Sequence, residues 1–307
     1  MYISISKASN ILKSGGIVAI PTETVYGLAG NALDEIVIAK IFAAKERPFF
    51  DPLIVHIAEF EELENLVAEI PKNAKLLAEK FWPGPLTLVL PKKKIVPDLT
   101  TGGLQTVAVR MPKKQIAKDI IKQAGFPLAA PSANMFQHLS PTTAEHVMEQ
   151  LGGKIDGIVD GGTCEVGIES TVIGFENEIP VIYRPGAITG EMIEDIGYKV
   201  RSIEAGHPSP GLLDKHYSPS TLLCLGLPDE VPHNSGLLAF GKLPANSERF
   251  AKILNLSESG DSTEAAANLY AALHKLDSFR LGRIFAMRLP ETGLGNAIND
   301  RLSRAGK

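Results

Sequence analysis

The sequence predicts a mixed α/β protein of two domains, and three observations lead to this prediction. Apolar runs typical of strands alternate with helix-period patterns through the first two-thirds of the 307 residues. A proline-containing segment at 206–220 then interrupts this alternation, and the alternation restarts after it. We therefore expect a first domain at 1–205, a linker at 206–220 and a smaller second domain at 221–307.

The expected elements of the first domain follow one another without a long gap. Strands are expected at Ile17–Ile20, Leu53–Ile57, Leu86–Leu90, Val107–Val109, Leu128–Ala130, Thr171–Phe175 and Val181–Tyr183. Helical patterns fall near 34–46, 60–81, 113–124, 142–151 and 189–196. This order predicts a mixed sheet with helices packed on it.

The second domain shows the same alternation on a smaller scale. Its expected strands are Leu222–Leu227, Gly236–Phe240 and Ile284–Leu289, and its expected helices are Ser262–Phe279 and Leu294–Ala305. The pattern predicts a small three-layer domain with a parallel sheet. A Gly-x-Gly-x-x-Gly turn is absent from the sequence, so nothing supports a dinucleotide site there.

Composition limits the classes of protein to consider. Apolar residues make up 44% and charged residues 21%, which is ordinary for a globular protein, and the net charge of -4 excludes a polycation built for nucleic acid. The stretch 92–122 nevertheless holds eight basic residues against two acidic ones, either as a patch for a polyanion or as a solvated lysine-rich face. The two cysteines lack metal or redox spacing, and no signal-peptide or membrane-length apolar run occurs, so we expect a cytoplasmic protein.

Candidate binding groups follow the first expected strand. Thr22, Glu23 and Thr24 leave the strand together, and their hydroxyl and carboxylate groups suit either a polar ligand or a local turn. The ends of strands in α/β sheets are where ligands usually bind. The sequence therefore leaves both a binding role and a turn open for this segment.

A second pair of candidates, Lys45 and Arg47, closes the helix expected at 34–46, for which Asp34 is the expected N-cap. Lys45 continues the apolar stripe of that helix, so its ammonium group is expected to point into the protein, and Pro48 places Arg47 in a loop. Two cations there suit a triphosphate. The alternative is a pair of favourable charges at a helix C-terminus.

Two strands carry one unusual residue each. His56 interrupts an apolar strand, where a histidine is either a ligand or a hydrogen-bonded core residue. In the strand around Val107–Val109, alternation places Thr106, Ala108 and Arg110 on one face. That face offers a hydroxyl, room for a ligand and a guanidinium that can bind a carboxylate or phosphate.

Further polar groups stand after later strands. Ser132 and Asn134 follow Ala130, and Thr142 is expected to cap a helix whose N-terminus would favour phosphate, although turn chemistry explains the same residues. Two more strand edges carry polar groups, at 169–171 and 183–186. The sequence has no Walker A loop, nucleophile elbow, kinase motif or metal-ligand spacing, so an ATP site would have to be assembled from dispersed residues.

In order and spacing these segments resemble the YrdC-like family of threonylcarbamoyl-AMP synthases. The matching marks are Pro21–Leu28, Lys45-x-Arg47-Pro48, Pro52–His56, Trp82–Thr87, Val107–Arg110, Ser132-x-Asn134 and Ser170–Val172. The segment His216–Pro219 and the tail Asn296–Arg304 are similar to the longer, two-domain form with a Rossmann-like C-terminal domain. Glu46 and the bulky loop 135–138 depart from the usual pattern, which concerns the shape of the loop more than the reaction.

The resemblance implies a twisted sheet with a concave basin in which L-threonine, bicarbonate and ATP form threonylcarbamoyl-AMP, pyrophosphate and water. Mg²⁺ would accompany the triphosphate, and a separate transferase would pass the threonylcarbamoyl group to tRNA. Whether the synthase itself makes a transient tRNA contact is left open by the sequence. The residues implied for threonine are Thr24, His56, Arg110, Ala130 and Ser170. Those implied for ATP are Arg47, Asp51, Thr106, Ser132, Asn134, Ser140, Arg184 and Tyr217, and those implied for catalysis are Lys45, Arg47 and Arg184.

Two physical expectations accompany this resemblance. The carbamate and the α-phosphate are both anions, so cations must screen their repulsion, and a closed basin must protect the labile carbamate from water. The linker is expected to close over the nucleotide through Tyr217. The alternative function is a non-catalytic module of the same fold that binds double-stranded RNA. A carbamoyltransferase of hydrogenase maturation is a weaker alternative, because its acylphosphatase and zinc-finger segments are missing from this sequence.

Overall fold

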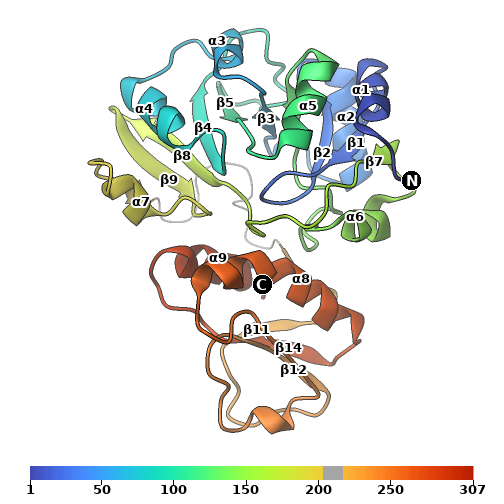
Figure 1. The fold of residues 1–307 in the computed structure, drawn as a ribbon, viewed down its shortest axis with the longest axis vertical. Coiled ribbons are helices and arrows are strands. Elements are labelled where there is room, and N and C mark those ends of the chain that lie inside the picture. The colour runs from blue at the N-terminus through green and yellow to red at the C-terminus, as the bar shows by residue number, and fades with distance from the viewer. Residues whose placement is uncertain (203–216, 307) are drawn as a thin grey trace.

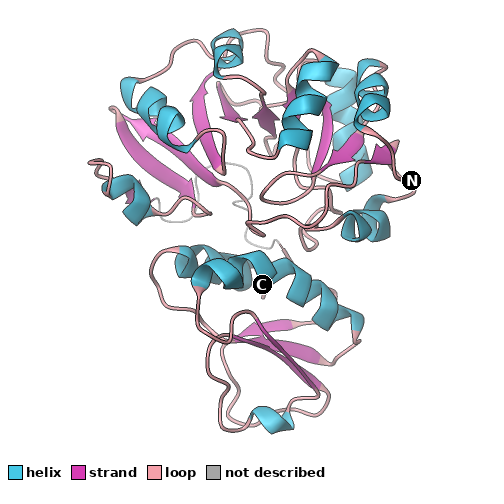
Figure 2. Ribbon diagram, in the orientation of Figure 1, coloured by secondary structure: helices cyan, strands magenta, loops and turns pink. Residues whose placement is uncertain are grey.

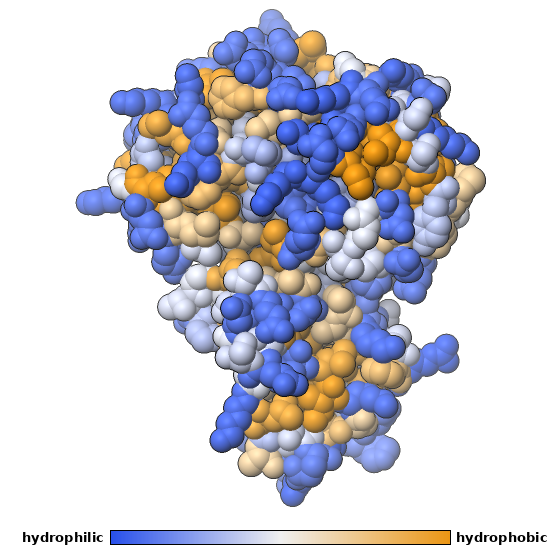
Figure 3. Space-filling model, viewed as in Figure 1, coloured by the Kyte–Doolittle hydropathy of each residue, from blue (hydrophilic) through white to orange (hydrophobic). Residues whose placement is uncertain are grey.

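The computed structural model of the chain describes residues 1–202 and 217–306. Two sheets, each with its own helices, form an upper and a lower body (Figure 1). Most of the expected linker, 206–216, lies outside the described residues, whereas 217–220 lie inside them. The face shown in Figure 3 is mainly hydrophilic, with separate hydrophobic patches on both bodies.

The upper body is built on a ten-stranded mixed sheet in the order β10-β9-β8-β4-β5-β3-β6-β2-β1-β7. Its strands are β1 (Val18–Ile20), β2 (Gly27–Asn31), β3 (Ile54–His56), β4 (Leu86–Pro91), β5 (Thr106–Arg110), β6 (Leu128–Ala129), β7 (Gly157–Ile158), β8 (Thr171–Glu176), β9 (Ile179–Arg184) and β10 (Arg201–Ser202). Parallel and antiparallel pairs alternate irregularly, and in the centre β3 runs parallel to β5 with His56 opposite Arg110. This register brings two expected site residues to the same edge.

Helices cover this sheet and place loops at its edges (Figure 2). They are α1 (Ile5–Lys13), α2 (Glu35–Lys45), α3 (Leu63–Leu66), α4 (Lys72–Phe81), α5 (Gln115–Ala124), α6 (Ala144–Leu151) and α7 (Gly190–Glu194), with a 3-10 turn η1 (Phe60–Glu62). The Asp34 side chain caps α2 by accepting from the backbone N–H groups of Ile36 and Val37, as expected. Lys45 ends the helix, and Glu46 takes a left-handed conformation at φ 55° before Pro48.

The lower body is a four-stranded parallel sheet in the order β11-β14-β12-β13. Its elements are β11 (Leu223–Leu225), β12 (Ser235–Ala239), η2 (Ser247–Arg249), β13 (Lys252–Asn255), α8 (Ser262–Ser278), β14 (Arg283–Ala286) and α9 (Leu294–Ala305). Both helices lie on the face turned toward the upper body (Figure 1). Loops around Phe250 and Val231 pack on the other face, so the expected third helical layer is replaced there by loops and η2.

The two bodies share a hydrophobic core and touch backbone to backbone. Val25, Leu139 and Ile168 of the upper body pack in one buried cluster with residues of α8, α9 and the lower sheet. Gly167, at φ 76°, lies so close to α8 that an added Cβ would be 2.4 Å from the Ala266 carbonyl oxygen and 2.5 Å from the Ala267 Cα. Both the close approach and the positive φ require glycine at this position.

The predicted mixed α/β fold with a smaller parallel domain is confirmed, and its local errors have physical causes. The strands β2, β7, β10 and β13 were not expected, because they are short or, like Gly27–Asn31, rich in small residues with weak β-propensity. The single helix expected at 60–81 is divided, and Pro71 precedes the first residue of α4. The expected cap Thr142 is wrong by one residue, since Thr143 accepts from the His146 N–H.

Candidate active site

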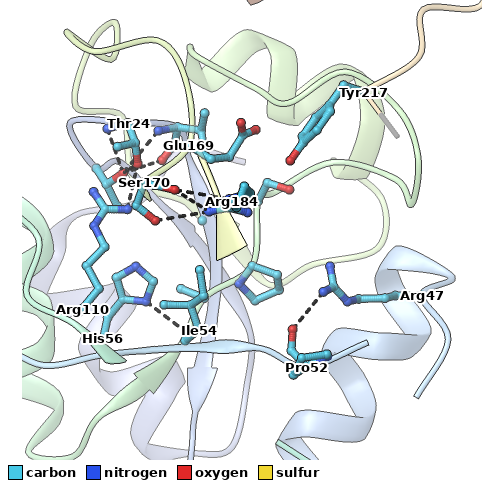
Figure 4. Close-up of a pocket in the computed structure, with 16 residues that line it drawn as sticks. Thr24, Arg47, Pro52, Ile54, His56, Arg110, Glu169, Ser170, Arg184 and Tyr217 are labelled. Carbon is cyan, nitrogen blue, oxygen red and sulfur yellow. Dashed lines mark hydrogen bonds between the residues drawn. The ribbon is translucent and has the colours of Figure 1, made fainter. Parts of the chain in front are cut away.

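A cavity with both polar and apolar lining residues opens between the edge of the upper sheet and the loops that face the lower body. The space between its lining atoms is about 570 Å³, including the part open to solvent. Arg110 and His56 lie at one end of it, Arg47 at the other and Arg184 between them (Figure 4). Three buried guanidinium groups around one cavity provide an environment for a ligand with several negative charges.

The first end of the cavity is organised by Arg110, the last residue of β5, which is 4% exposed. Its Nη2 lies 2.7 Å from a carboxylate oxygen of the buried Glu23, its Nη1 donates to the Thr24 hydroxyl at 2.8 Å, and its Nε donates to the Gly84 carbonyl. A guanidinium has five N–H groups, so two remain for an incoming carboxylate after these three contacts among the described residues. Arg110 is therefore held rigidly and can still bind a ligand.

His56 lies beside Arg110 and is held in the neutral form. Burial and the neighbouring charge of Arg110 lower the pKa of His56 to about 3. Its Nδ1 lies 3.2 Å from the Ile54 carbonyl oxygen. A neutral imidazole at this place can offer a hydrogen bond to a ligand without adding charge.

The opposite end of the cavity is formed by Arg47 in the loop after α2. Its Nη2 lies 2.8 Å from the Asp51 carboxylate and donates to the Pro52 carbonyl, and its Nε donates to the Asp51 carbonyl. Burial lowers the pKa of Arg47, although Asp51 opposes this effect, and burial raises the pKa of Asp51. These contacts aim the Arg47 side chain into the cavity.

Between the two ends, Arg184 at the end of β9 is fixed to Ser170. Its Nε and Nη2 donate to the Ser170 carbonyl oxygen at 3.2 and 2.9 Å, and Nη2 also contacts the Ser170 hydroxyl at 3.2 Å. That hydroxyl is 2.7 Å from the Thr87 hydroxyl in β4. The adjacent strands β4, β8 and β9 thus set the position of a central cation.

Lys45 does not line the cavity but holds one of its loops. Lys45 is 1% exposed, and its Nζ donates to the carbonyl oxygens of Ser132 at 2.5 Å and Asn134 at 2.6 Å. Burial and the neighbouring Arg47 lower the pKa of Lys45 well below its ordinary value. The Asn134 amide in turn donates to the Met135 and His138 carbonyls. The expectation that Lys45 points into the protein is confirmed.

The wall facing the lower body contains Glu169, which is 6% exposed. Its carboxylate accepts from the Ser140 hydroxyl at 2.6 Å, from the Tyr270 hydroxyl at 3.0 Å and from Arg301 Nε at 2.9 Å. Burial alone would raise the pKa of Glu169, but the charges of Arg301 and Arg184 lower it below the ordinary value. The lower body therefore contributes directly to this wall.

Tyr217 lines the cavity next to this wall (Figure 4). It is 1% exposed, has φ 63°, and its ring lies 5.4 Å from the Arg301 guanidinium carbon and 5.9 Å from the Tyr270 ring. The following residue, Ser218, donates its N–H to the Gln137 carbonyl at 2.8 Å. The described end of the segment expected as a lid is thus bonded to the loop that carries Gln137, and its Tyr217 belongs to the cavity lining.

Comparison with known proteins shows which family the chain belongs to. A family profile for Sua5, YciO and YrdC proteins, described as "Telomere recombination", matches residues 10–186. A second profile, described as "Threonylcarbamoyl-AMP synthase, C-terminal domain", matches residues 188–306. The chain belongs to the Sua5/YciO/YrdC family.

Individual relatives of this family match over nearly the whole chain. A threonylcarbamoyl-AMP synthase of Pyrococcus abyssi is 43% identical over 97% of this chain and 92% of its own length, and one of Bacillus subtilis is 41% identical over 98% and 92%. The crystal structure of P. abyssi Sua5 complexed with L-threonine has a TM-score of 0.90 at 42% identity and covers 98% of this chain and 94% of that one. Escherichia coli YciO, at 24% identity and a TM-score of 0.52, shares the fold of the upper body.

The structure gathers most of the residues that the family resemblance implied, but not all of them. The cavity is lined by Thr24, Arg47, His56, Arg110, Ala130, Ser132, Ser170, Arg184 and Tyr217. Lys45, Asp51, Asn134 and Ser140 stand behind the lining and hold its members. Thr106 lies at the far end of β5, in a separate cavity with Val89 and Tyr183.

Some residues of the site had no distinct signal in the sequence. Glu169 and Glu23 lie within motifs noted in the sequence, but the sequence does not show which residues they pair with. Glu169 pairs with Arg301, 132 positions away, and Glu23 pairs with Arg110, 87 positions away, and only the fold shows these pairs. Among the described residues, no group of three or more histidine, cysteine or acidic side chains could hold a metal ion. No helix in the described ranges combines the length and hydropathy needed to cross a membrane.

Proposed function

We propose that the chain is an L-threonylcarbamoyladenylate synthase, which converts L-threonine, bicarbonate and ATP into threonylcarbamoyl-AMP, pyrophosphate and water. The observation that carries the proposal is the single cavity in which a carboxylate-binding arginine at one end faces two further arginines. Family membership and near full-length relatives named as threonylcarbamoyl-AMP synthases support it. They give no support to the alternative of a non-catalytic RNA-binding module.

Threonine would occupy the end of the cavity around Arg110. Its carboxylate would take the two remaining N–H groups of that guanidinium, and Thr24, His56, Ala130 and Ser170 would surround the rest of the amino acid. This arrangement leaves the amine of threonine directed away from the cation. The amine must be free because it adds to bicarbonate to form the carbamate, with loss of water.

ATP would occupy the other side, between Arg47 and Arg184. The carbamate oxygen attacks the α-phosphate, and pyrophosphate leaves with the electron pair of the broken P–O bond. Both reacting groups are anions, and the two arginines, with Mg²⁺ carried in by the triphosphate as part of the nucleotide substrate, would screen their repulsion. The sole carboxylate among the described lining residues, Glu169, is already paired, so the metal would be held mainly by phosphate oxygens and water.

The remaining implied residues would act through this lining. Lys45 would hold the loop that carries Ser132 and Asn134 at the nucleotide, and Asp51 would aim Arg47. Ser140 would act through Glu169, to which it donates, and Tyr217 would close the cavity over the nucleotide. Thr106 would reach ATP only if the nucleotide extends along β5 toward the second cavity.

The product is an activated carbamoyl adenylate that water destroys, so a transferase must consume it soon after release. We place the enzyme in the cytoplasm, with the modification of tRNA as the destination of its product. A transient contact with tRNA would use the basic stretch 92–122. Several of its lysines are already paired, Lys92 with Asp98, Lys114 with Glu165 and Lys122 with Glu59, which points to weak rather than strong RNA binding.

Pyrophosphate release from ATP by the purified chain tests the proposal, with threonine and bicarbonate omitted in turn. Release should need both substrates and should be lost in Arg47→Ala, while a surface control such as Lys7→Ala should behave like the wild type. Release that is independent of threonine or bicarbonate would contradict the synthase reaction. A folded protein that releases no pyrophosphate at all would favour the RNA-binding alternative, which a salt-dependent RNA titration would then examine.

A further inference from the structure

A buried carboxylate in a cavity for a triphosphate presents an electrostatic problem. Glu169 lines the same cavity as Arg47 and Arg184, and an ionised carboxylate there would repel phosphate groups. Burial does not remove the charge, because the arginines around Glu169 lower its pKa below the ordinary value. The cavity can accept a polyanion only if this carboxylate is both neutralised and turned away from the ligand.

The groups that do so come mainly from the lower body. Of the three donors to the Glu169 carboxylate, Tyr270 belongs to α8 and Arg301 to α9, while Ser140 belongs to the upper body. All three are buried, with Arg301 only 1% exposed. The direction of the Glu169 side chain therefore depends on the docking of the lower body against the upper one.

Arg301 holds more than this carboxylate. Its Nη1 donates to the carbonyl oxygen of Pro185 at 2.7 Å, next to Arg184 in the chain, and contacts Asp300 at 3.0 Å. Its guanidinium also lies against the Tyr217 ring. One side chain of the lower body thus contacts Glu169 in the cavity wall, Pro185 next to Arg184, and Tyr217 in the cavity lining.

We propose that Arg301 is a positioning residue for the nucleotide: by neutralising and fixing Glu169 it lets the cavity accept the triphosphate, which makes the docked C-terminal domain part of the ATP site. This inference rests on the proposed function and adds to it a role for the second domain. Because coupling between sites is reciprocal, ATP in turn strengthens the docking of the two domains.

The test uses the full-length chain and three substitutions. Arg301→Met removes the charge and keeps much of the volume, Glu169→Gln/Arg301→Met removes both charges, and Arg304→Met on the same helix is the matched control, since Arg304 pairs with Asp300 and does not contact Glu169. Calorimetric titration with ATP, and with inorganic triphosphate as a probe, measures binding without turnover. Steady-state pyrophosphate release gives the KM for ATP and for threonine separately.

Arg301→Met should weaken ATP and triphosphate binding by about tenfold or more, within the usual range of coupling between sites, and leave the KM for threonine unchanged. The double variant should recover most of the ATP affinity, because no unpaired carboxylate remains in the cavity. In the single variant, ATP binding should also improve as the pH falls toward the range where Glu169 protonates. The groups that face Glu169 and remain there are Arg184, Ser140, Tyr270 and Tyr217, and burial raises the pKa of both tyrosines.

Unchanged ATP affinity in a folded Arg301→Met protein would overturn the proposal, and so would an equal loss in the single and double variants, since that result indicates a purely structural role. If Arg301→Met does not fold, Tyr270→Phe removes only a hydroxyl group that donates to Glu169 and should weaken triphosphate binding in the same direction; unchanged binding there would count against the proposal. Triphosphate binding does not depend on the identity of the product. Failure of the synthase reaction and failure of this inference are therefore separate results.

Discussion

The ion pair between Arg110 and Glu23 allows stability and substrate binding to be separated in one experiment. Both side chains are buried, at 4% and 1% exposure, and their atoms lie 2.7 Å apart. Arg110→Met leaves the Glu23 carboxylate uncompensated, and breaking a buried pair on one side typically costs about 3–5 kcal/mol of unfolding free energy. The same substitution removes the guanidinium proposed to bind the threonine carboxylate.

The loss of binding can be estimated independently of the loss of stability. One hydrogen bond to a charged group contributes about 1.5–3 kcal/mol, so Arg110→Met should raise the KM for threonine by about 10- to 150-fold. The double variant Glu23→Gln/Arg110→Met removes both charges. It should recover most of the unfolding free energy, because the glutamine can still accept from the Lys113 N–H, but it should not recover the KM.

Denaturant unfolding and pyrophosphate release at varied threonine concentration measure the two quantities. The KM for ATP serves as the internal control, since Arg110 lies at the other end of the cavity from Arg47. A double variant with the wild-type KM for threonine would remove Arg110 from the proposed threonine site. A single variant as stable as the wild type would refute the reasoning about the buried pair.

Three further predictions follow from the cavity and its surroundings. Lys45→Met should lower pyrophosphate release by about 100-fold, because the loop at 132–134 loses its support and a small misplacement is costly; normal activity in the folded variant would contradict this. Tyr217→Ala should raise the KM for ATP or increase leakage of the adenylate, and unchanged kinetics together with unchanged retention would exclude a lid role. Burial lowers the pKa of His56 to about 3 and that of His274 to about 4, so below pH 6.5 the unfolded state binds more protons than the folded state. Denaturant titrations should therefore show that the free energy of unfolding falls by about 2 kcal/mol per histidine between pH 6.5 and 5, and His56→Gln or His274→Gln should reduce this fall.

Sequence patterns predicted the parts of this structure that depend on local interactions. The cap at Asp34, the inward direction of Lys45 and the strand carrying Arg110 all follow from periodicity and capping preferences. The strand Gly27–Asn31 could not be predicted in this way, because its small residues form a strand only through pairing with β1 and β6 on either side.

The site shows the same division between local and long-range information. Motifs placed Arg47, Arg110 and Arg184 near strand or helix ends, and the cavity brings them together. The spacing of residues in the sequence could not predict the hydrogen bonds from Tyr270 and Arg301 to Glu169, because the donors are 101 and 132 positions away in the chain. Thr106 shows a different limit of sequence patterns, since alternation assigned it the face of Arg110 but gave no information about the distance along the strand that places Thr106 at a separate cavity.

The contact at Gly167 has a consequence for how such a protein can be recombined. Because a single methyl group there would overlap the backbone of Ala266 and Ala267, the two domains can dock in this way only if position 167 has no side chain. A C-terminal domain transplanted from another protein would fit only if its first helix approached equally closely and the glycine were kept. Chimeras that exchange the domains should therefore tolerate many changes in the lower sheet, while a bulky residue at position 167 should be rejected whatever domain follows it.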